Sequence, residues 1–446
     1  MLMLSRRGLL FGVILIVGFL LLACGGDEEE DGGEATKPAE TSGPATEQVQ
    51  GVTDTEIILG THYPMSNSPA AVYANSAYAM EAYFDSINDQ GGVNGRKITF
   101  VIEDDQYAPS LAVEAVRRLV EQKKVFAIAN GLGDPGHYSV FKYLEEKGIP
   151  DLFLGGGIPA FSDPPGKLRF VSIPSYDTEV KAELAYLQEH YSGKKIALLV
   201  QNDEAGRGSE EVFRENLEES GIDIEIVGAE YYDFTESVMT AQAQRLKATN
   251  PDLVVFMSAP AQAANFAKSA RELLNWDVPF ICGLVAGGDF YIALAGPEAA
   301  EGTIGMTYGP YLYTPGAEGG YQPLRDGMAK YKPEVPINSQ TTYGWGVAEL
   351  IVKALQNAGR DLTPESVAKG AESIKDWCCA ACFAPVTLSP DDHRPQELIV
   401  FVQVKDGKWE FTGEWASIET TPGALKICPF FEKIVPNTKE LTVPQG

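Results

Sequence analysis

The chain has 446 residues, 44% of them hydrophobic and 10% aromatic, so it can bury the cores of two or three domain-sized units. Its 62 acidic residues outnumber 35 Lys and Arg residues, and the formal net charge is −27. A negative field of that size repels nucleic acid and anionic lipid head groups, which excludes both as partners.

The N-terminus has the composition of a secretory signal peptide, predicted over residues 1–23. Two arginines precede an unbroken apolar run at 8–23, which is shorter than the ~20 residues that span a bilayer comfortably. The run ends in Leu-Leu-Ala-Cys at 21–24, which resembles the lipobox of bacterial lipoproteins. The resemblance implies cleavage before Cys24 and acylation of Cys24. An uncleaved anchor with an incidental Cys is the alternative.

A tether follows the signal peptide. Residues 25–50 are mostly Gly, Glu, Asp, Pro, Thr and Ala, and none is aromatic. Such a segment cannot bury enough apolar surface to offset its ordering entropy. We therefore expect a lipidated, disordered acidic linker over residues 24–51.

Strands and helices alternate from residue 52. The apolar patterns predict strands at 56–60, 97–103, 125–129 and 152–154, and helices at 70–88, 111–122 and 135–146. This order favours a parallel sheet with helices on both faces.

The alternation then begins again. The patterns predict strands at 196–200, 222–230, 253–257 and 279–283, and helices at 209–220, 237–248 and 261–274. Two later helices, at 342–357 and 364–374, precede a hairpin of 398–405 and 408–411 around an Asp-Gly turn. Two doubly wound units in one exported chain indicate a clamshell that holds its ligand at the carboxyl ends of the strands.

Four motifs, taken in order, resemble a known family. They are VTDTEIILG at 52–60, NDQGGVNGRK at 88–97, EDD at 103–105 and SPDDHR at 389–394. Together they resemble the leucine-binding-protein-like solute-binding proteins of branched-chain amino acid and amide ABC importers. The resemblance extends from about residue 52 to 413.

The resemblance implies an α/β fold of two doubly wound, Rossmann-like lobes joined by a multi-strand hinge, the type I periplasmic binding protein fold. Lobe 1 would comprise residues 52–175 and 310–385. Lobe 2 would comprise residues 176–309 and 386–446.

The implied function is that of an ABC importer's substrate-binding lipoprotein. It would capture an amino acid, an amide or a related small solute between the lobes and deliver it to a permease. We expect a monomer, lipid-anchored outside the cytoplasm at the cell surface or periplasmic face, with no cofactor and no metal. No nucleophile elbow, P-loop or dinucleotide fingerprint is present, so we do not expect an enzyme. The alternative is an exported sensor or receptor module of the same fold.

In this family the ligand is held by loops at strand ends and by helix N-termini, where unpaired N–H groups favour anionic groups. The candidate ligand-binding residues are Ser66, Asn67, Tyr73, Gly133, Asp134, Gly156, Gly157, Asp203, Ser258, Leu284 and Tyr308. For Tyr73 and Tyr308 the alternative is an aromatic side chain of a helix or core.

Three positions depart from the amino-acid-binding relatives. Asp134 stands where they hold the ligand's carboxylate, although it could instead be the N-cap before Pro135. The glycines at 155–157 stand where they carry Thr, although a turn with positive φ would also need Gly. Near Leu284 the acid that meets the ligand's ammonium group is missing. We therefore predict that the clamp for a zwitterion is absent.

Besides Cys24 the chain has five cysteines, so at least one stays unpaired. The disulfide candidates are Cys378, Cys379, Cys382 and Cys428. We expect Cys428 to pair with one of the other three, and Cys282 to be buried and free. Cys378, Cys379 and Cys382 lack a second ligand pair at metal-binding spacing, and the four histidines show no such spacing either.

Overall fold

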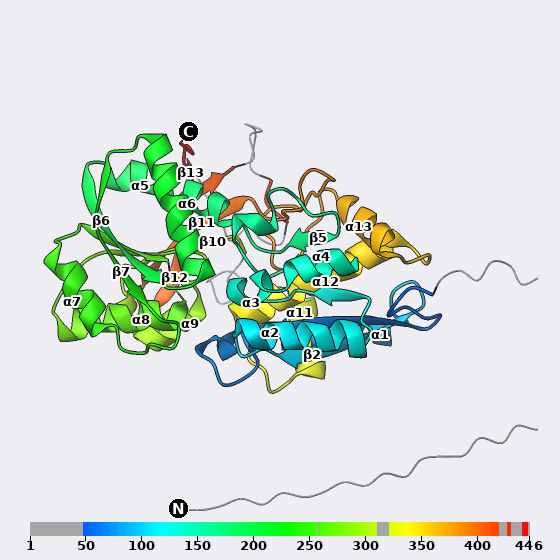
Figure 1. The fold of residues 1–446 in the computed structure, drawn as a ribbon. Helices are drawn as coiled ribbons and strands as arrows, with labels where there is room; N and C mark the ends of the chain where they lie inside the picture. Colours follow the sequence, from blue (N-terminus) through cyan, green and yellow to red (C-terminus); the bar gives the residue numbers. More distant parts are fainter. Residues whose placement is uncertain (1–47, 258, 310–320, 419–425, 430–438, 445–446) are drawn as a thin grey trace, which may run out of the picture. The chain divides into compact units, whose positions relative to one another are not determined.

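Two helix-covered sheets organise the chain (Figure 1). The computed structural model describes residues 48–257, 259–309, 321–418, 426–429 and 439–444. Both sheets belong to one unit that begins at Gln48. The predicted signal peptide, Cys24 and most of the linker lie outside the described residues.

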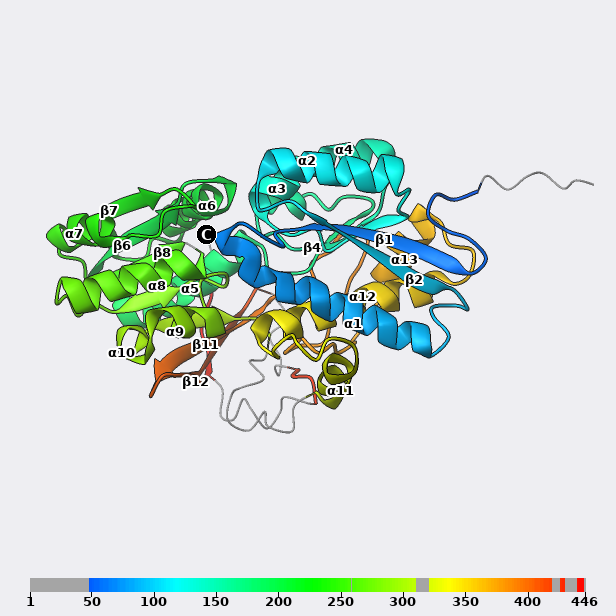
Figure 2. The ribbon, with the colours of Figure 1, turned by 90° about the horizontal axis from the view of Figure 1, so that it is seen from below.

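The first sheet is entirely parallel, with the strand order β2-β1-β3-β4-β5. Its strands are β1 (Glu56–Tyr63), β2 (Lys97–Asp104), β3 (Ala127–Ala129), β4 (Asp151–Leu154) and β5 (Arg169–Val171). Its helices are α1 (Ala74–Asp89), α2 (Pro109–Arg117), α3 (Asp134–Tyr138), α4 (Phe141–Lys147), α11 (Gln322–Tyr331), α12 (Ser339–Ala358) and α13 (Pro364–Glu372). Figure 2 shows α2, α3 and α4 on one face, with α1, α12 and α13 on the other. We call this sheet with its helices the first lobe.

The second sheet has the order β13-β12-β11-β10-β9-β8-β6-β7. Its strands are β6 (Lys194–Gln201), β7 (Ile224–Tyr232), β8 (Leu253–Met257), β9 (Phe280–Cys282), β10 (Ile304–Thr307), β11 (Leu398–Lys405), β12 (Lys408–Ser417) and β13 (Lys439–Glu440). Its helices are α5 (Tyr176–Tyr191), α6 (Glu204–Ser220), α7 (Thr240–Ala248), α8 (Pro260–Lys268), α9 (Asp289–Ala295) and α10 (Pro297–Ala300). This is the second lobe.

Alternating side chains of β6 show how the second sheet is buried on both faces. Ala197 and Leu199 join the core under α7 and α8, while Leu198 and Val200 join the core under α5. Since successive side chains of a strand point to opposite faces, a strand covered on both sides must be apolar throughout. That explains the continuous apolar run of this strand.

The chain passes between the lobes three times. It leaves β5 for α5, leaves β10 for α11, and returns after α13 to β11. The hairpin of β11 and β12 pairs antiparallel to β10, so the last third of the chain completes the second sheet. These crossings bring strand ends of both sheets to one region.

The helix predicted at 135–146 is wrong as a single element. It is divided into α3 and α4, and Ser139 and Val140 lie between them. The Ser139 hydroxyl donates a hydrogen bond of 2.6 Å to the Gly136 carbonyl, and such a bond competes with the helical ladder.

Several helices and strands were not predicted from the sequence, chiefly α5, α9, α11, β5 and β10. Helix α5 buries two acids, Glu179 and Glu183, among its apolar side chains. Its apolar pattern is therefore interrupted, and periodicity alone does not reveal the helix.

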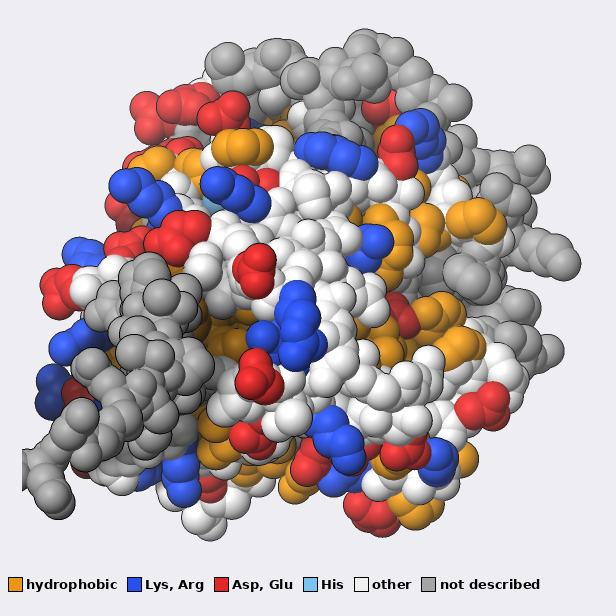
Figure 3. Space-filling model, turned by 90° about the vertical axis from the view of Figure 1, so that its right-hand side faces the viewer, with side chains coloured by type: hydrophobic (Ala, Val, Ile, Leu, Met, Phe, Trp, Pro, Cys, Tyr) orange, Lys and Arg blue, Asp and Glu red, His pale blue; other side chains and the backbone are white. Residues whose placement is uncertain are grey.

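Charged side chains of both signs are interspersed on the face shown in Figure 3. The negative net charge is therefore not gathered into a single acidic patch among the described residues of this face. Among the described helices, none is both long and apolar enough to cross a membrane.

Candidate ligand-binding site

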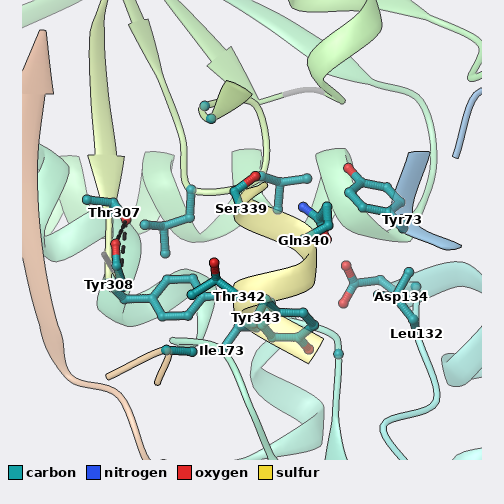
Figure 4. A pocket seen from close by; sticks show the side chains of 18 of the residues that line it. Tyr73, Leu132, Asp134, Ile173, Thr307, Tyr308, Ser339, Gln340, Thr342 and Tyr343 are labelled. Carbon is teal, nitrogen blue, oxygen red and sulfur yellow. Dashed lines mark hydrogen bonds between the residues drawn. The ribbon is translucent and has the colours of Figure 1, made fainter. Parts of the chain in front are cut away.

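A cavity of about 150 Å³ opens between the two lobes. Its walls come from strand-end loops of both sheets and from the first turn of α12. We call it the interlobe cavity, and its lining residues are Tyr73, Tyr107, Leu132, Gly133, Asp134, Gly155, Ile173, Leu284, Val285, Gly287, Gly288, Thr307, Tyr308, Gly309, Ser339, Gln340, Thr342, Tyr343 and Ala381. In Figure 4 the start of α12 lies between Tyr73 and Asp134 on one side and Thr307 and Tyr308 on the other.

Helix α12 can present its first turn because its N-terminus is capped outside the cavity. Asn338 accepts a hydrogen bond from the Thr341 N–H, and the Thr341 hydroxyl in turn accepts one from the Asn338 N–H. Gln340 is held by a hydrogen bond of 2.9 Å from the Ser76 hydroxyl. Tyr343, one turn further on, has its hydroxyl 2.6 Å from Ser172 Oγ and 2.8 Å from Asn130 Nδ2. The polar wall of the cavity is thus fixed before any ligand arrives.

Asp134 crosslinks two loops of the first lobe. Its Oδ1 accepts hydrogen bonds from the Gly157 N–H at 2.8 Å and the Ile158 N–H at 3.3 Å. Its Oδ2 accepts one of 2.6 Å from the Tyr176 hydroxyl. Burial raises the pKa of Asp134, and these hydrogen bonds act in the opposite direction.

The alternative that Asp134 is an N-cap is wrong. Gly133 is the N-cap of α3, and Asp134 is the first helical residue. The Asp134 carboxylate occupies backbone N–H groups of another loop, the kind of group that would otherwise bind a ligand's carboxylate.

The glycines of that loop allow Asp134 and Tyr176 to approach its backbone closely, and a positive φ does not explain them. Gly155, Gly156 and Gly157 are absent from the positions with positive φ, so that alternative is wrong. A Cβ on Gly156 would lie 2.8 Å from Asp134 Oδ1, and one on Gly157 would lie 2.6 Å from the Tyr176 ring. A side chain at either position would push Asp134 or Tyr176 away.

A buried chain of hydrogen bonds anchors α3, which carries Asp134. Asp105 bonds to His62 at 2.6 Å, His62 to His137 at 3.0 Å, and His137 to Asp151 at 2.7 Å. All four side chains are buried. Because β1, β4 and the loop after β2 each contribute one partner, this chain holds α3 against the strand ends. No cluster of three or more His, Cys, Asp or Glu in the described part of the chain is placed to hold a metal ion.

On the second lobe, Glu179 of α5 lies beside Leu284. Its Oε1 accepts a hydrogen bond of 2.9 Å from the Leu284 N–H. An acid from another element therefore lies next to position 284. Burial, opposed by the Leu284 hydrogen bond and assisted by the nearby Asp134 charge, raises the pKa of Glu179 to about 7.

Within the described part of the chain, the predicted site residues fall into three groups. Five line the interlobe cavity, namely Tyr73, Gly133, Asp134, Leu284 and Tyr308. Behind the walls lie Gly156, Gly157 and Asp203, the last of which caps α6 through the Ala205 and Gly206 N–H groups. Ser66 and Asn67 lie in the loop after β1, where Ser66 bonds to Asp104, and neither lines this cavity. Ser258 lies outside the described residues.

Some lining residues were not predicted. Tyr107 lies in the loop after β2, three residues beyond the strand end, so the strand-end argument could have found it. Gln340 and Tyr343 belong to the start of α12, where the capping pattern of Asn338 and Thr341 is a visible signal. Glu179 carries no such signal, because it lies inside a helix that the pattern did not reveal.

An α/β chain with two mostly parallel sheets, three crossings and a ligand-sized cavity at the strand ends of both sheets defines the class of two-lobed solute-binding proteins. Comparison with known proteins agrees. The family model described as periplasmic binding protein matches residues 56–408, and the chain belongs to this family. The family consists of solute-binding proteins, which are not enzymes and act outside the cytoplasm.

Curated relatives are distant but cover most of the chain. A Leu/Ile/Val-binding protein homolog of Brucella suis is 23% identical over 321 residues, which are 70% of this chain and 81% of that protein. An amino acid binding protein of Pseudomonas aeruginosa is 24% identical over 326 residues, 72% of this chain and 82% of that protein.

Solved structures confirm the predicted fold. A branched-chain amino acid ABC transporter protein of Thermus thermophilus with bound valine has a TM-score of 0.72 at 21% identity, covering 81% of this chain and 96% of that chain. A fatty acid ABC transporter substrate-binding protein of Thermomonospora curvata has a TM-score of 0.70 at 21% identity, and the match covers 87% of this chain and 97% of that chain. Because two such different ligands occur on one fold, the fold does not name the ligand here.

Proposed function

We propose that this protein is the substrate-binding lipoprotein of an ABC importer, and that it captures a small solute between its lobes and delivers it to a permease. The observation that carries the proposal is the interlobe cavity, whose walls come from the strand ends of both sheets. A ligand bound there contacts both lobes at once, so binding favours a closed form that a permease can recognise.

A thermal-shift screen of small solutes tests ligand capture. A ligand that binds only the folded protein raises the melting temperature by mass action, and amino acids, amides and amines are the classes to compare. The expected outcome is one class that stabilises the protein at micromolar concentration. No stabilisation by any small solute would contradict the proposal.

The proposal also includes a lipid anchor at Cys24. The Leu-Leu-Ala-Cys ending of the apolar run supports it. Expression of Cys24→Ser in a bacterial host with radiolabelled palmitate should give an unprocessed, unlabelled chain, with Cys282→Ser as the labelled control. Acyl labelling of the Cys24→Ser chain would contradict the anchor.

The ligand itself is expected to lack a carboxylate. The Asp134 carboxylate already accepts hydrogen bonds from the Gly157 and Ile158 N–H groups of the first lobe. A ligand carboxylate beside it would be repelled by several kcal/mol if water is excluded. Neutral or cationic solutes are therefore favoured over ordinary α-amino acids.

A further inference from the structure

A second, smaller cavity of about 50 Å³ adjoins the interlobe cavity. The two share Tyr73, Tyr107, Asp134 and Val285 as lining residues. We call it the side cavity. Its remaining walls come from the starts of α5 and α6 and from strand ends and following loops of the second sheet. They are Tyr176, Glu179, Gln201, Ala205, Gly206, Ser209, Phe234, Phe256, Met257, Ala259, Gly283 and Ala286.

Two carboxylates face the side cavity without a cationic partner. Asp134 comes from the first lobe and Glu179 from the second, and both are at least 94% buried. None of the described residues that line either cavity is Lys, Arg or His. Neither acid takes part in an ion pair among the described residues. A buried acid without a counter-charge is costly, and a ligand that brings the charge relieves that cost.

The rest of the lining suits an organic cation. Five aromatic residues line the side cavity, namely Tyr73, Tyr107, Tyr176, Phe234 and Phe256. Tyr107 stacks on Phe234 across the lobes, with ring centroids 4.4 Å apart. Aromatic faces attract ammonium groups through their quadrupole. No group of three or more His, Cys, Asp or Glu among the described residues is placed to hold a metal ion, so these walls suit an organic cation better than a bare metal ion.

The Tyr73 hydroxyl is an independent sign of a missing ligand group. Its oxygen is buried and has no hydrogen-bond partner among the described residues. In Figure 4, Tyr73 lies beside Asp134 at one end of the interlobe cavity. A buried hydroxyl without a partner is costly, and an ammonium N–H in the side cavity would supply the bond.

We propose that the side cavity binds the ammonium group of a small organic cation, between Asp134 and Glu179, while the uncharged remainder of the ligand occupies the interlobe cavity. This rests on the proposed function, because both cavities form one solute site. About 50 Å³ holds an ammonium or methylated ammonium group, and about 150 Å³ holds a group as large as an aromatic ring. The raised pKa values of both acids agree with a site that lacks its cation.

Calorimetry with three matched probes tests the proposal on the whole chain. 2-Phenylethylamine carries the cation, 2-phenylethanol replaces it with a neutral group, and phenylalanine adds a carboxylate. We expect 2-phenylethylamine to bind at least tenfold more tightly than either of the others. Methylammonium chloride, as the head group alone, should raise the melting temperature more than sodium chloride at the same ionic strength.

Two variants locate the cation. Glu179→Gln should weaken 2-phenylethylamine binding at least tenfold. Glu183→Gln is the matched control, because Glu183 is one turn away on α5, is also buried and lines neither cavity. It should leave the affinity unchanged.

Three results would overturn the proposal. They are equal binding of the alcohol and the amine, equal amine binding by Glu179→Gln, and no amine effect beyond that of sodium chloride. Tight binding of a neutral solute alone would refute the cation site and leave the importer role standing. Absence of any solute binding in the thermal-shift screen would remove the importer role as well.

Discussion

Asp134 shows how one side chain can set the charge that a cavity presents to a ligand. Its carboxylate accepts two backbone N–H groups and the Tyr176 hydroxyl, so the groups that would hold a ligand's carboxylate already hold an internal one. These hydrogen bonds hold the Asp134 carboxylate at the wall of the cavity, where a ligand meets its charge. We therefore expect ligand selection to depend on this residue.

Replacing Asp134 should open the anion site. In Asp134→Ser the Gly157 and Ile158 N–H groups become free, and leucine affinity should rise at least tenfold, about 1.4 kcal/mol. Asp134→Asn is the matched control, because it removes the charge but keeps an oxygen on those N–H groups, and its gain should be smaller. Titration calorimetry measures both. Submicromolar leucine binding by the unmodified protein would show that Asp134 does not exclude carboxylates.

Glu183 should make folding stability depend on pH. Burial, and then the charge of Glu179, raises the pKa of Glu183 well above its ordinary value of 4.5. The folded protein therefore keeps a proton that the unfolded chain loses, and stability falls as pH rises above about 4.5. Its Oε1 has no hydrogen-bond partner among the described residues, so neutral Gln should be tolerated.

Glu183→Gln should accordingly be more stable than the unmodified protein at pH 8, by roughly 1–3 kcal/mol, and equal to it at pH 4. Urea unfolding at pH 4, 6 and 8 measures the difference. Glu218→Gln, an exposed acid of α6, should show no such divergence. Parallel stability curves for Glu183→Gln and the unmodified protein would contradict the argument.

At the scale of elements, covalent links and helix starts position the walls of the cavity. Ala381, a lining residue, lies between Cys379 and Cys382, which form a disulfide. Cys378 is bonded to Cys428, and Cys282 is buried and free. The segment that contacts the first turns of α12 is therefore held both by its own short link and by a link to the end of the chain.

The two disulfides should differ in their contribution to stability. Cys378 and Cys428 are 50 residues apart, whereas Cys379 and Cys382 are 3 apart. A crosslink restricts the unfolded chain more when it closes a longer loop. Cys378→Ala with Cys428→Ala should lower the free energy of unfolding by ~2–4 kcal/mol, and Cys379→Ala with Cys382→Ala by less. Guanidinium unfolding compares the pairs, and a larger loss for the short link would contradict the loop argument.

At the scale of the whole molecule, three crossings join lobes that each have their own sheet and core. Three connecting segments allow the lobes to bend toward each other but keep them from separating. Ligand binding should therefore close the lobes as rigid bodies. The stacking of Tyr107 on Phe234 is one contact that already spans the lobes.

Small-angle scattering should detect this closure. The radius of gyration is expected to fall when the stabilising solute from the thermal-shift screen is added at saturation. Tyr107→Ala, which removes the interlobe stack, should give a larger radius without ligand and a larger decrease with it. An unchanged radius with saturating ligand would contradict a clamshell mechanism.

The sequence by itself determined the class of fold and the family. Apolar runs such as 253–257 and the alternation of strands and helices are local signals that can be read from the sequence. The apolar runs are visible because a buried parallel strand must be apolar along its whole length. The motifs at 52–60 and 88–97 then pointed to periplasmic binding proteins, which the family match confirms. The lobe boundaries and the lipid anchor stay predictions.

Only the tertiary structure decided the chemistry of the site. Asp134 meets Gly157 and Tyr176, and Glu179 meets Leu284 across 105 residues of sequence. No local pattern encodes such pairs, because they form only when segments far apart in the sequence pack together. The charge of the cavity is a property of that packing, and for this reason the sequence alone did not place Glu179 beside position 284.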